Sequence, residues 1–248
     1  MLIFIDDNDL RGKALGEIFT SEGYNVTTDI KNTHLADFSY LGINGKLYED
    51  SIFKIGSRIY TVIHNDNLAL RLEDEGVFYD NLYNDDELVH GGTLLTTEAL
   101  LSYMIADNSI GLLNAMVLVI GFGNCGKDIA KKYTALDSVV TVTNRGYKYE
   151  QEVLDLGYEY VSLNDLSLSD FDFVINTVPA PVISDELLST FKSTGKIYDI
   201  ASAPGGLKTP GSWHNYAFLP GLPAKYAYKT SALMFYESII KKESKYVE

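Results

Sequence analysis

The 248-residue chain has room for one large or two small domains, and its 46% hydrophobic content indicates a globular protein. The formal net charge of -14 argues against a general nucleic-acid or anionic-membrane surface, because both partners need a basic face. A single cysteine excludes an intramolecular disulfide and a cysteine-based zinc site, and no other metal site is predicted. Without a recognisable signal peptide or membrane-spanning run, we expect a soluble, cytoplasmic protein.

The chain opens with the pattern of a βαβ unit that lacks a glycine fingerprint. Leu2 to Ile5 predicts a buried strand, apolar residues at helical spacing follow from Leu10 to Phe19, and Tyr24 to Thr28 predicts the next strand. Asp6 and Asp7 resemble a metal or phospho-acceptor pocket, but capping of the following helix explains them more simply.

Short strands are predicted over the next segment, at residues 38–43, 52–55, 58–63 and 77–79, with Gly56-Ser57 as a hairpin turn. Residues 81–92 are polar and contain glycine, which suggests a hinge. Apolar residues from Leu94 to Met104 then share one helical face, so residues 92–112 are expected to link two domains.

The most informative stretch begins with the apolar run Met116 to Ile120. A G-x-G-x-x-G turn follows it, made of Gly121, Phe122, Gly123, Asn124, Cys125 and Gly126. Apolar residues at helical spacing come next, so the motif has the strand–turn–helix context that a dinucleotide fingerprint requires. Gly121 would form the tight turn, Gly123 would admit the pyrophosphate, and Gly126 would let the helix pack closely. An ordinary glycine turn is the alternative.

The residues after the next strand bear on the choice of cofactor. Residues 139–143 predict that strand, and Asn144 and Arg145 follow it about twenty residues past the glycines. An NAD-binding unit usually has Asp or Glu there, whereas an arginine suits a 2′-phosphate, and Lys148 could add a second positive charge. The sequence therefore predicts NADP over NAD, with a solvated loop arginine as the alternative.

Further strand ends complete the predicted site. Residues 172–178 predict a buried strand in which Thr177, Val178 and Pro179 reach the expected ribose and nicotinamide. Another buried strand at 196–200 opens into Ala201 and Ser202. The predicted fold is α/β with two domains: a smaller N-terminal α/β domain (1–91) and, after the linking helix, a Rossmann doubly wound parallel sheet (113–228). A C-terminal helix (229–248) follows.

Few side chains suit acid–base or nucleophilic chemistry. We expect Lys229 to anchor a carboxylate or donate a proton, and Glu98 to face the same cleft, although a solvated lysine and a capping glutamate are the plainer alternatives. His214 is expected to be an exposed loop histidine. Cys125 is expected to be a small turn residue rather than a catalytic thiol.

Two loop motifs carry a resemblance to a known family. The segments Asp199-Ile-Ala-Ser-Ala-Pro-Gly-Gly206 and Leu219-Pro-Gly-Leu-Pro223, with Lys229-Thr230, resemble motifs of the A subunit of dipicolinate synthase. The likeness extends to residues 175–179, the glycine loop, and Thr96 with Glu98, whereas residues 1–90 match only in general pattern. Pro220 belongs to the second motif and is expected beside the cofactor.

The resemblance implies an NADP-linked oxidoreductase that makes dipicolinate, the calcium-chelating spore compound, from a dihydrodipicolinate-type cyclic imine. It also implies a partner, the flavoprotein-like B subunit, and we expect a homo-oligomer. On this basis Ser202, the Gly205 and Gly206 amides and Lys229 would hold the two carboxylates of the substrate. Pro179 would shape the nicotinamide pocket, while the cofactor performs the difficult step.

The chain departs from the family at two points. Ala203 stands where the family usually has arginine, and the N-terminal domain looks shorter than the family's. Two other functions therefore remain open: a 2-hydroxyacid-dehydrogenase-like or other small-molecule oxidoreductase, and a non-catalytic NADP-binding subunit.

Overall fold

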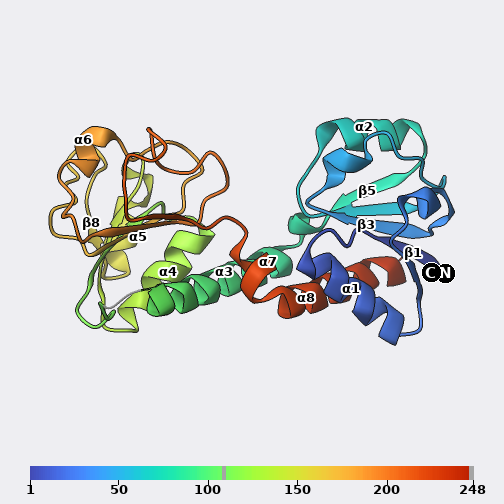
Figure 1. Cartoon of the computed structure of the whole chain (residues 1–248), viewed down its shortest axis with the longest axis horizontal. Coiled ribbons are helices and arrows are strands. Elements are labelled where there is room, and N and C mark those ends of the chain that lie inside the picture. The colour runs from blue at the N-terminus through green and yellow to red at the C-terminus, as the bar shows by residue number, and fades with distance from the viewer. Residues whose placement is uncertain (108–109, 246–248) are drawn as a thin grey trace. The chain divides into compact units, whose positions relative to one another are not determined.

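The structure, a computed structural model, describes residues 1–107 and 110–245 and divides into two compact units. Unit 1 comprises Met1–Gly92 together with the chain from Pro223, and unit 2 comprises Thr93–Leu222. Each unit contains a parallel sheet with helices against it, which confirms the predicted α/β class with two domains (Figure 1).

The described part of unit 1 is built on a five-stranded sheet of order β2-β1-β3-β4-β5. Its strands are β1 (Leu2–Ile5), β2 (Asn25–Thr27), β3 (Phe38–Gly42), β4 (Arg58–Thr61) and β5 (Phe78–Asn81). Its helices are α1 (Leu10–Ser21), α2 (Asp66–Asp74) and α8 (Tyr228–Ser244), and short 3-10 helices cover Ile30–Leu35, Gly45–Tyr48 and Leu82–Asn84. Two helices cross the unit boundaries, namely α3 (Asp86–Asp107) and α7 (Leu222–Tyr226).

Apolar side chains cover both faces of this sheet. On one face Phe19 of α1 and Phe235 of α8 pack against Phe38 and Tyr60, and on the other Leu68 of α2 packs in a cluster with Ile59. This burial explains why the C-terminal helix, expected as a separate element at 229–248, is part of unit 1.

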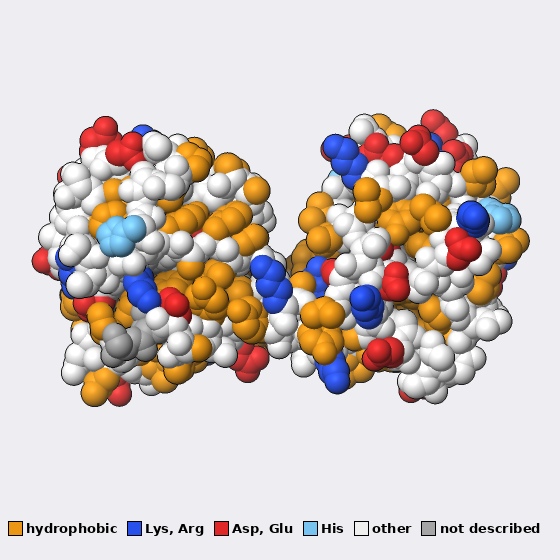
Figure 2. Space-filling view, in the orientation of Figure 1, with side chains coloured by type: hydrophobic (Ala, Val, Ile, Leu, Met, Phe, Trp, Pro, Cys, Tyr) orange, Lys and Arg blue, Asp and Glu red, His pale blue; other side chains and the backbone are white. Residues whose placement is uncertain are grey.

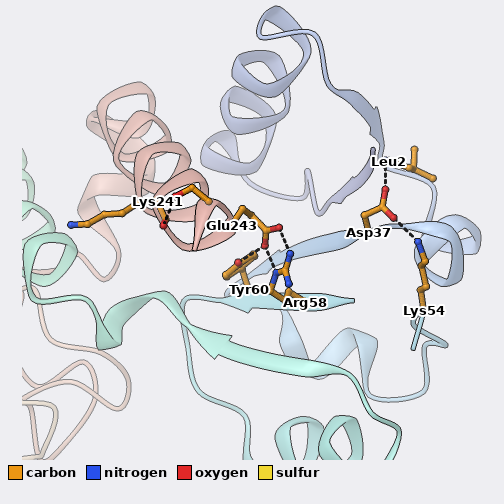
Figure 3. A network of polar contacts seen from close by, with 8 residues as sticks. Leu2, Asp37, Lys54, Arg58, Tyr60, Lys241 and Glu243 are labelled. Carbon is orange, nitrogen blue, oxygen red and sulfur yellow. Dashed lines mark hydrogen bonds and ion pairs between the residues drawn. The ribbon is translucent and has the colours of Figure 1, made fainter. Parts of the chain in front are cut away.

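An ion pair fixes the end of α8 to the start of β4. The Glu243 carboxylate accepts hydrogen bonds from Nε and Nη2 of Arg58 and from the hydroxyl of Tyr60 (Figure 3). Glu243 is 7% exposed, so both partners interact away from bulk water. Burial and the Glu243 hydrogen bond together raise the pKa of Tyr60, which therefore remains a donor.

Several local predictions in unit 1 are wrong. Residues 52–55 form no strand, and β4 runs parallel to its neighbours, so the hairpin at Gly56-Ser57 is absent. Ile52 and Ile55 are 73% and 80% exposed, which shows that these apolar residues do not face the core. The expected hinge at 81–92 is instead occupied largely by the first turns of α3. Gly91 is required there, since a Cβ would collide with the Met234 side chain.

The described part of unit 2 contains a six-stranded parallel sheet of order β11-β10-β9-β6-β7-β8. Its strands are β6 (Met116–Ile120), β7 (Val139–Thr143), β8 (Glu159–Tyr160), β9 (Phe173–Asn176), β10 (Lys196–Asp199) and β11 (Tyr216–Phe218). Besides its part of α3, the unit has α4 (Asn124–Thr134), α5 (Glu150–Asp155), α6 (Asp185–Leu188) and a 3-10 turn at Tyr147–Tyr149. The chain runs outward in both directions from β6, which is the Rossmann order with a switch point between β6 and β9.

Surface features agree with the acidic composition. On the face shown in Figure 2, lysine and arginine side chains are scattered among apolar and acidic ones. Within the described residues, no helix combines the length and the hydropathy that crossing a membrane requires.

Candidate dinucleotide and substrate site

Two of the three fingerprint glycines are required by backbone packing. Gly121 follows β6 with a φ of 100°, and a Cβ there would press against Thr177 Oγ1 and lie 2.9 Å from Val178 Cγ2. A Cβ on Gly126 would collide with the carbonyl oxygen of Gly121. The first glycine therefore permits the turn and the last permits close packing of α4, as the fingerprint requires.

Gly123 differs from these two, because no atom lies within 4 Å of the position that a Cβ would take. It is the N-cap residue of α4, and no side chain caps the helix. The first-turn N–H groups of α4 therefore keep their hydrogen-bonding capacity, and the space in front of them is open. This cradle fits a pyrophosphate, which a positive helix terminus stabilises.

The side chains of the glycine loop are less available than its backbone. Phe122 is 1% exposed and packs against Tyr149 and Tyr158, so it could contact a cofactor only through its main chain. Burial raises the pKa of the Cys125 thiol despite a hydrogen bond with Thr93, which disfavours the thiolate that nucleophilic catalysis needs. Asn124, by contrast, is exposed.

The carboxyl end of β7 offers positive charge at the surface. Arg145 and Lys148 are exposed, and the Asn144 side chain accepts a hydrogen bond of 2.8 Å from the Arg145 N–H. Within residues 1–107 and 110–245 the Arg145 guanidinium forms no ion pair, while the Lys148 ammonium lies 5.1 Å from the Tyr149 ring centroid. A small cavity of about 100 Å³ lies here, lined by Asn144, Arg145, Gly146, Tyr160, Ser162, Leu163 and Asn164.

The carboxyl end of β9 lies directly against the glycine loop. The N–H and the hydroxyl of Thr177 both donate to the Ile120 carbonyl, at 3.0 and 2.9 Å. Thr177 and Val178 are half-buried, whereas Pro179 is exposed. The structure thus brings these three predicted cofactor residues next to Gly121, at the switch point where open α/β sheets bind ligands.

A buried carboxylate occupies the end of β10. Asp199 is 0% exposed. Its Oδ1 accepts from Asn176 Nδ2 (2.9 Å) and the Ala201 N–H (3.1 Å), and its Oδ2 accepts from the Gly206 N–H (2.5 Å) and the Tyr216 hydroxyl (2.6 Å). These four donors come from two neighbouring strands and from both ends of the 201–206 loop.

This arrangement corrects the expectation that the Gly205 and Gly206 amides hold a substrate carboxylate. The Gly206 N–H donates to Asp199, and the Gly205 N–H donates to the Ser202 carbonyl. A Cβ on Gly206 would lie 2.5 Å from Asn176 Nδ2, and one on Gly205 would lie 2.9 Å from the Tyr216 hydroxyl. The glycine pair is therefore needed for the approach to this network.

The tip of the same loop points outward. Ser202 is exposed and Ala201 is buried. Within the part of the chain that the structure describes, the backbone N–H groups of Ser202 and Ala203 have no acceptor. Half-buried Pro220 follows β11 at the same edge of the sheet. A hydroxyl and two amides next to each other can bind an anionic oxygen.

Three other candidate residues lie elsewhere. Lys229 is exposed in the first turn of α8, in unit 1, whereas Glu98 is exposed on the part of α3 that belongs to unit 2. His214 is an exposed loop residue as expected, and its Nε2 lies 3.1 Å from the Ser193 carbonyl oxygen.

Sequence reasoning assigned no role to Asp199, Asn176 or Tyr216. One signal pointed to Asp199, since a charged residue ends an otherwise apolar strand, but its four donors lie up to 23 positions away in sequence. Tyr216 gave no signal, because nothing in its surroundings distinguishes it from a surface aromatic. Burial and the bond to Asp199 raise the pKa of its hydroxyl, which stays protonated and keeps donating.

Residues 102–201 match the NAD-binding domain of D-isomer specific 2-hydroxyacid dehydrogenases. Over 155 residues the chain is 28% identical to the A subunit of dipicolinate synthase from Bacillus subtilis (strain 168), and the match covers 60% of this chain and 52% of the relative. The chain resembles the dipicolinate synthase A subunit. The matched segment spans about half the length of that curated relative.

Solved structures extend the likeness in fold to the whole chain. The A subunit of dipicolinate synthase from Bacillus halodurans superposes with a TM-score of 0.79 at 21% identity, covering 97% of this chain and 96% of that one. The A chain of dipicolinate synthase from Bacillus subtilis gives a TM-score of 0.79 at 20% identity, covering 100% and 98%. The N-terminal unit, in which the sequence matched only in general pattern, therefore shares the fold of the dipicolinate synthase A subunit.

Together the domain match and these relatives support an NAD(P)-dependent oxidoreductase with a nucleotide-binding Rossmann fold. The cofactor is a nicotinamide dinucleotide, and the glycine cradle fits its pyrophosphate. The curated relative is one subunit of a synthase, which suggests that a partner subunit exists.

Proposed function

We propose that the chain oxidises a dihydrodipicolinate-type cyclic imine to dipicolinate with NADP⁺. The reaction removes a hydride and a proton from the ring, so that substrate and NADP⁺ give dipicolinate, NADPH and H⁺. When bound, the nicotinamide accepts the hydride. The observation that carries the proposal is the pairing, at one edge of the sheet, of the open glycine cradle with an exposed loop whose free amides suit a carboxylate.

Binding and orientation are the tasks left to the protein. The residues around the site supply few acid–base groups, and aromatisation of the ring provides the driving force, so correct positioning accounts for most of the required catalysis. Thr177, Val178 and Pro179 would line the nicotinamide side of the cofactor, because they follow β9 beside Gly121. Ala201 and Pro220 would lie next to it at the ends of β10 and β11.

The preference for NADP over NAD is part of the proposal. Three features support it: Arg145 is exposed without an ion pair in the described chain, Lys148 is exposed close by, and neither Asn144 nor Arg145 is acidic. Arginine binds a phosphate through a planar fork of donors, and a second positive charge strengthens the interaction.

We assign one carboxylate of the substrate to the loop tip. The Ser202 hydroxyl and the Ser202 and Ala203 N–H groups are free to donate in the described structure, in place of the Gly205 and Gly206 amides. They would bind without the arginine that the family usually has where this chain has Ala203. Lys229 would hold the second carboxylate, and Glu98 would assist the proton transfer. Lys229→Met should then raise the substrate KM about tenfold or more, the loss of roughly one charged hydrogen bond.

The decisive assay supplies freshly generated dihydrodipicolinate and NADP⁺, with and without a homologue of the synthase B subunit. Ultraviolet absorbance follows dipicolinate and NADPH together, and equal rates for both products would support the function. NADPH binding without either product would contradict it. Activity only in the presence of the B subunit would show that a flavoprotein-like partner is required.

A 2-hydroxyacid oxidoreductase is the second candidate, because residues 102–201 match that NAD-binding domain. Supplying 2-oxo acids with NADPH tests it in the same instrument. Oxidation of NADPH by a 2-oxo acid, in the absence of activity on the cyclic imine, would select this candidate.

A further inference from the structure

The 201–206 loop has an interior and an exterior set of backbone amides. Those of Ala201 and Gly206, at its two ends, point inward and donate to the two oxygens of Asp199. Those of Ser202 and Ala203, at its tip, have no acceptor in the described structure. The curvature of the loop therefore depends on one carboxylate, which draws both ends inward while the tip remains exposed.

All the groups around this carboxylate are neutral donors. Asn176 and Tyr216 complete the four hydrogen bonds, and within the described residues Asp199 forms no ion pair. A buried carboxylate without a cation is costly unless each oxygen is fully hydrogen-bonded, and here each oxygen accepts two bonds. Since a carboxylate accepts and cannot donate, the network specifies the directions of both loop amides.

The same network reaches the nicotinamide side of the site. The Asn176 side chain donates to the Val178 carbonyl at 3.0 Å and accepts from the Val178 N–H at 3.2 Å. Ends of β9, β10 and β11 are thereby joined through Asp199. Movement of this carboxylate would displace the Val178 segment and the Ser202 tip together.

We infer that Asp199 is a positioning residue, which holds the Ser202–Ala203 tip at a fixed place beside the Thr177–Pro179 segment so that a substrate carboxylate meets oriented donors. The function given to the tip rests on the proposed reaction. Asp199 is fully buried, so it acts through Ala201 and Gly206 and not by contact with substrate.

Tyr216→Phe tests this inference mildly, because it deletes one donor and leaves the other three. Asp199→Asn tests it strongly, because its NH₂ group would face backbone N–H donors at one oxygen position. The control is Tyr198→Phe, which removes a tyrosine–aspartate hydrogen bond of 2.9 Å to Asp107 on the same sheet but away from the loop.

Two measurements are made on the full-length chain. Hydrogen exchange of the 200–207 peptide, relative to the β9 peptide, reports the loop directly and needs no substrate. Steady-state kinetics and NADPH titration separate substrate KM from cofactor affinity. Tyr216→Phe should speed loop exchange and raise KM about tenfold, the factor expected for one hydrogen bond, while the NADPH dissociation constant stays within about twofold. Asp199→Asn should produce larger changes of the same kind.

Wild-type exchange and wild-type KM in Tyr216→Phe would overturn the inference, as would equal effects in Tyr198→Phe. An equal loss of NADPH affinity and substrate binding would also overturn it, because a purely structural role predicts that result. If the wild type does not oxidise dihydrodipicolinate, the proposed function fails and the exchange measurement alone decides whether Asp199 holds the loop.

Discussion

Gly121 and Thr177 lie so close together at the ends of β6 and β9 that no side chain fits on the glycine. The Thr177 hydroxyl donates to the carbonyl just before Gly121, and a Cβ on Gly121 would press against that hydroxyl. The contact joins the pyrophosphate cradle to the segment expected to line the nicotinamide. Both halves of the cofactor site thus depend on one backbone approach.

The first prediction concerns these glycines. Gly121→Ala should lower the free energy of unfolding by about 1–3 kcal/mol, because the residue combines a positive φ with a steric conflict, and NADPH binding should be lost with it. Gly123→Ala is the matched control. Its Cβ meets no atom, so stability should be retained while NADPH binding weakens. Urea unfolding and fluorescence titration measure both effects, and normal NADPH binding by Gly123→Ala would contradict the pyrophosphate assignment.

A second prediction concerns the Arg58–Glu243 pair of unit 1. Glu243→Gln should destabilise the protein by about 3 kcal/mol, because it leaves a largely buried guanidinium without its counter-charge. Lys241→Gln, just before it on α8, removes only an exposed pair with Glu87 and should leave the unfolding midpoint unchanged (Figure 3). Similar midpoints for the two variants would show that the buried pair does not anchor α8.

The third prediction is a pH dependence. Hydrogen bonds from Lys54 and from the Leu2 N–H lower the pKa of Asp37 below its ordinary value of 3.8 (Figure 3). A lowered folded-state pKa stabilises the protein above the unfolded value, and this contribution is lost as the pH falls through the folded value. Asp37→Asn should therefore be less stable than wild type at pH 6. The difference should shrink below about pH 3.8.

Urea unfolding of both proteins between pH 2 and 6 measures this difference. The effect should be small, because the side chains of Lys54 and Asp37 are 48% and 36% exposed and water screens the pair. A stability difference that stays constant with pH would assign the loss to packing rather than to charge.

The sequence predicted most of unit 2 because its signals are local. The apolar run Met116–Ile120, the glycine turn and the following helix lie together in the chain, and each constrains the others. Strands β7, β9 and β10 were likewise predicted from continuous apolar stretches, as expected for strands buried on both faces. The carboxyl edge of a parallel sheet then brings their ends together.

Unit 1 was harder, because its apolar stretches are short. Ile52 and Ile55 suggested a strand but are exposed, whereas helix α2 was missed although Leu68 and Leu72 have helical spacing. Asn65, whose side chain accepts a hydrogen bond from the Leu68 N–H, was its available N-cap signal. Short apolar runs fit a strand or a helix equally well, and tertiary contacts decide between them.

The substrate loop was predicted as a motif but not as a structure. Sequence identified Ser202 and the two glycines, yet the inward direction of the Gly206 amide follows from Asp199, which only the folded arrangement places beside it. Hydrogen bonds between distant residues leave no periodic pattern in the sequence.

Titration with NADP⁺ and NAD⁺ tests most directly whether this edge of the sheet holds a 2′-phosphorylated cofactor, and it requires neither a partner protein nor an unstable substrate. Wild type should bind NADP⁺ more tightly. Arg145→Ala should reduce the ratio of the two dissociation constants by about 10- to 100-fold, the equivalent of roughly 1.5–3 kcal/mol for hydrogen bonds to a charged group. An unchanged ratio in Arg145→Ala, or a wild type that prefers NAD⁺, would contradict the account.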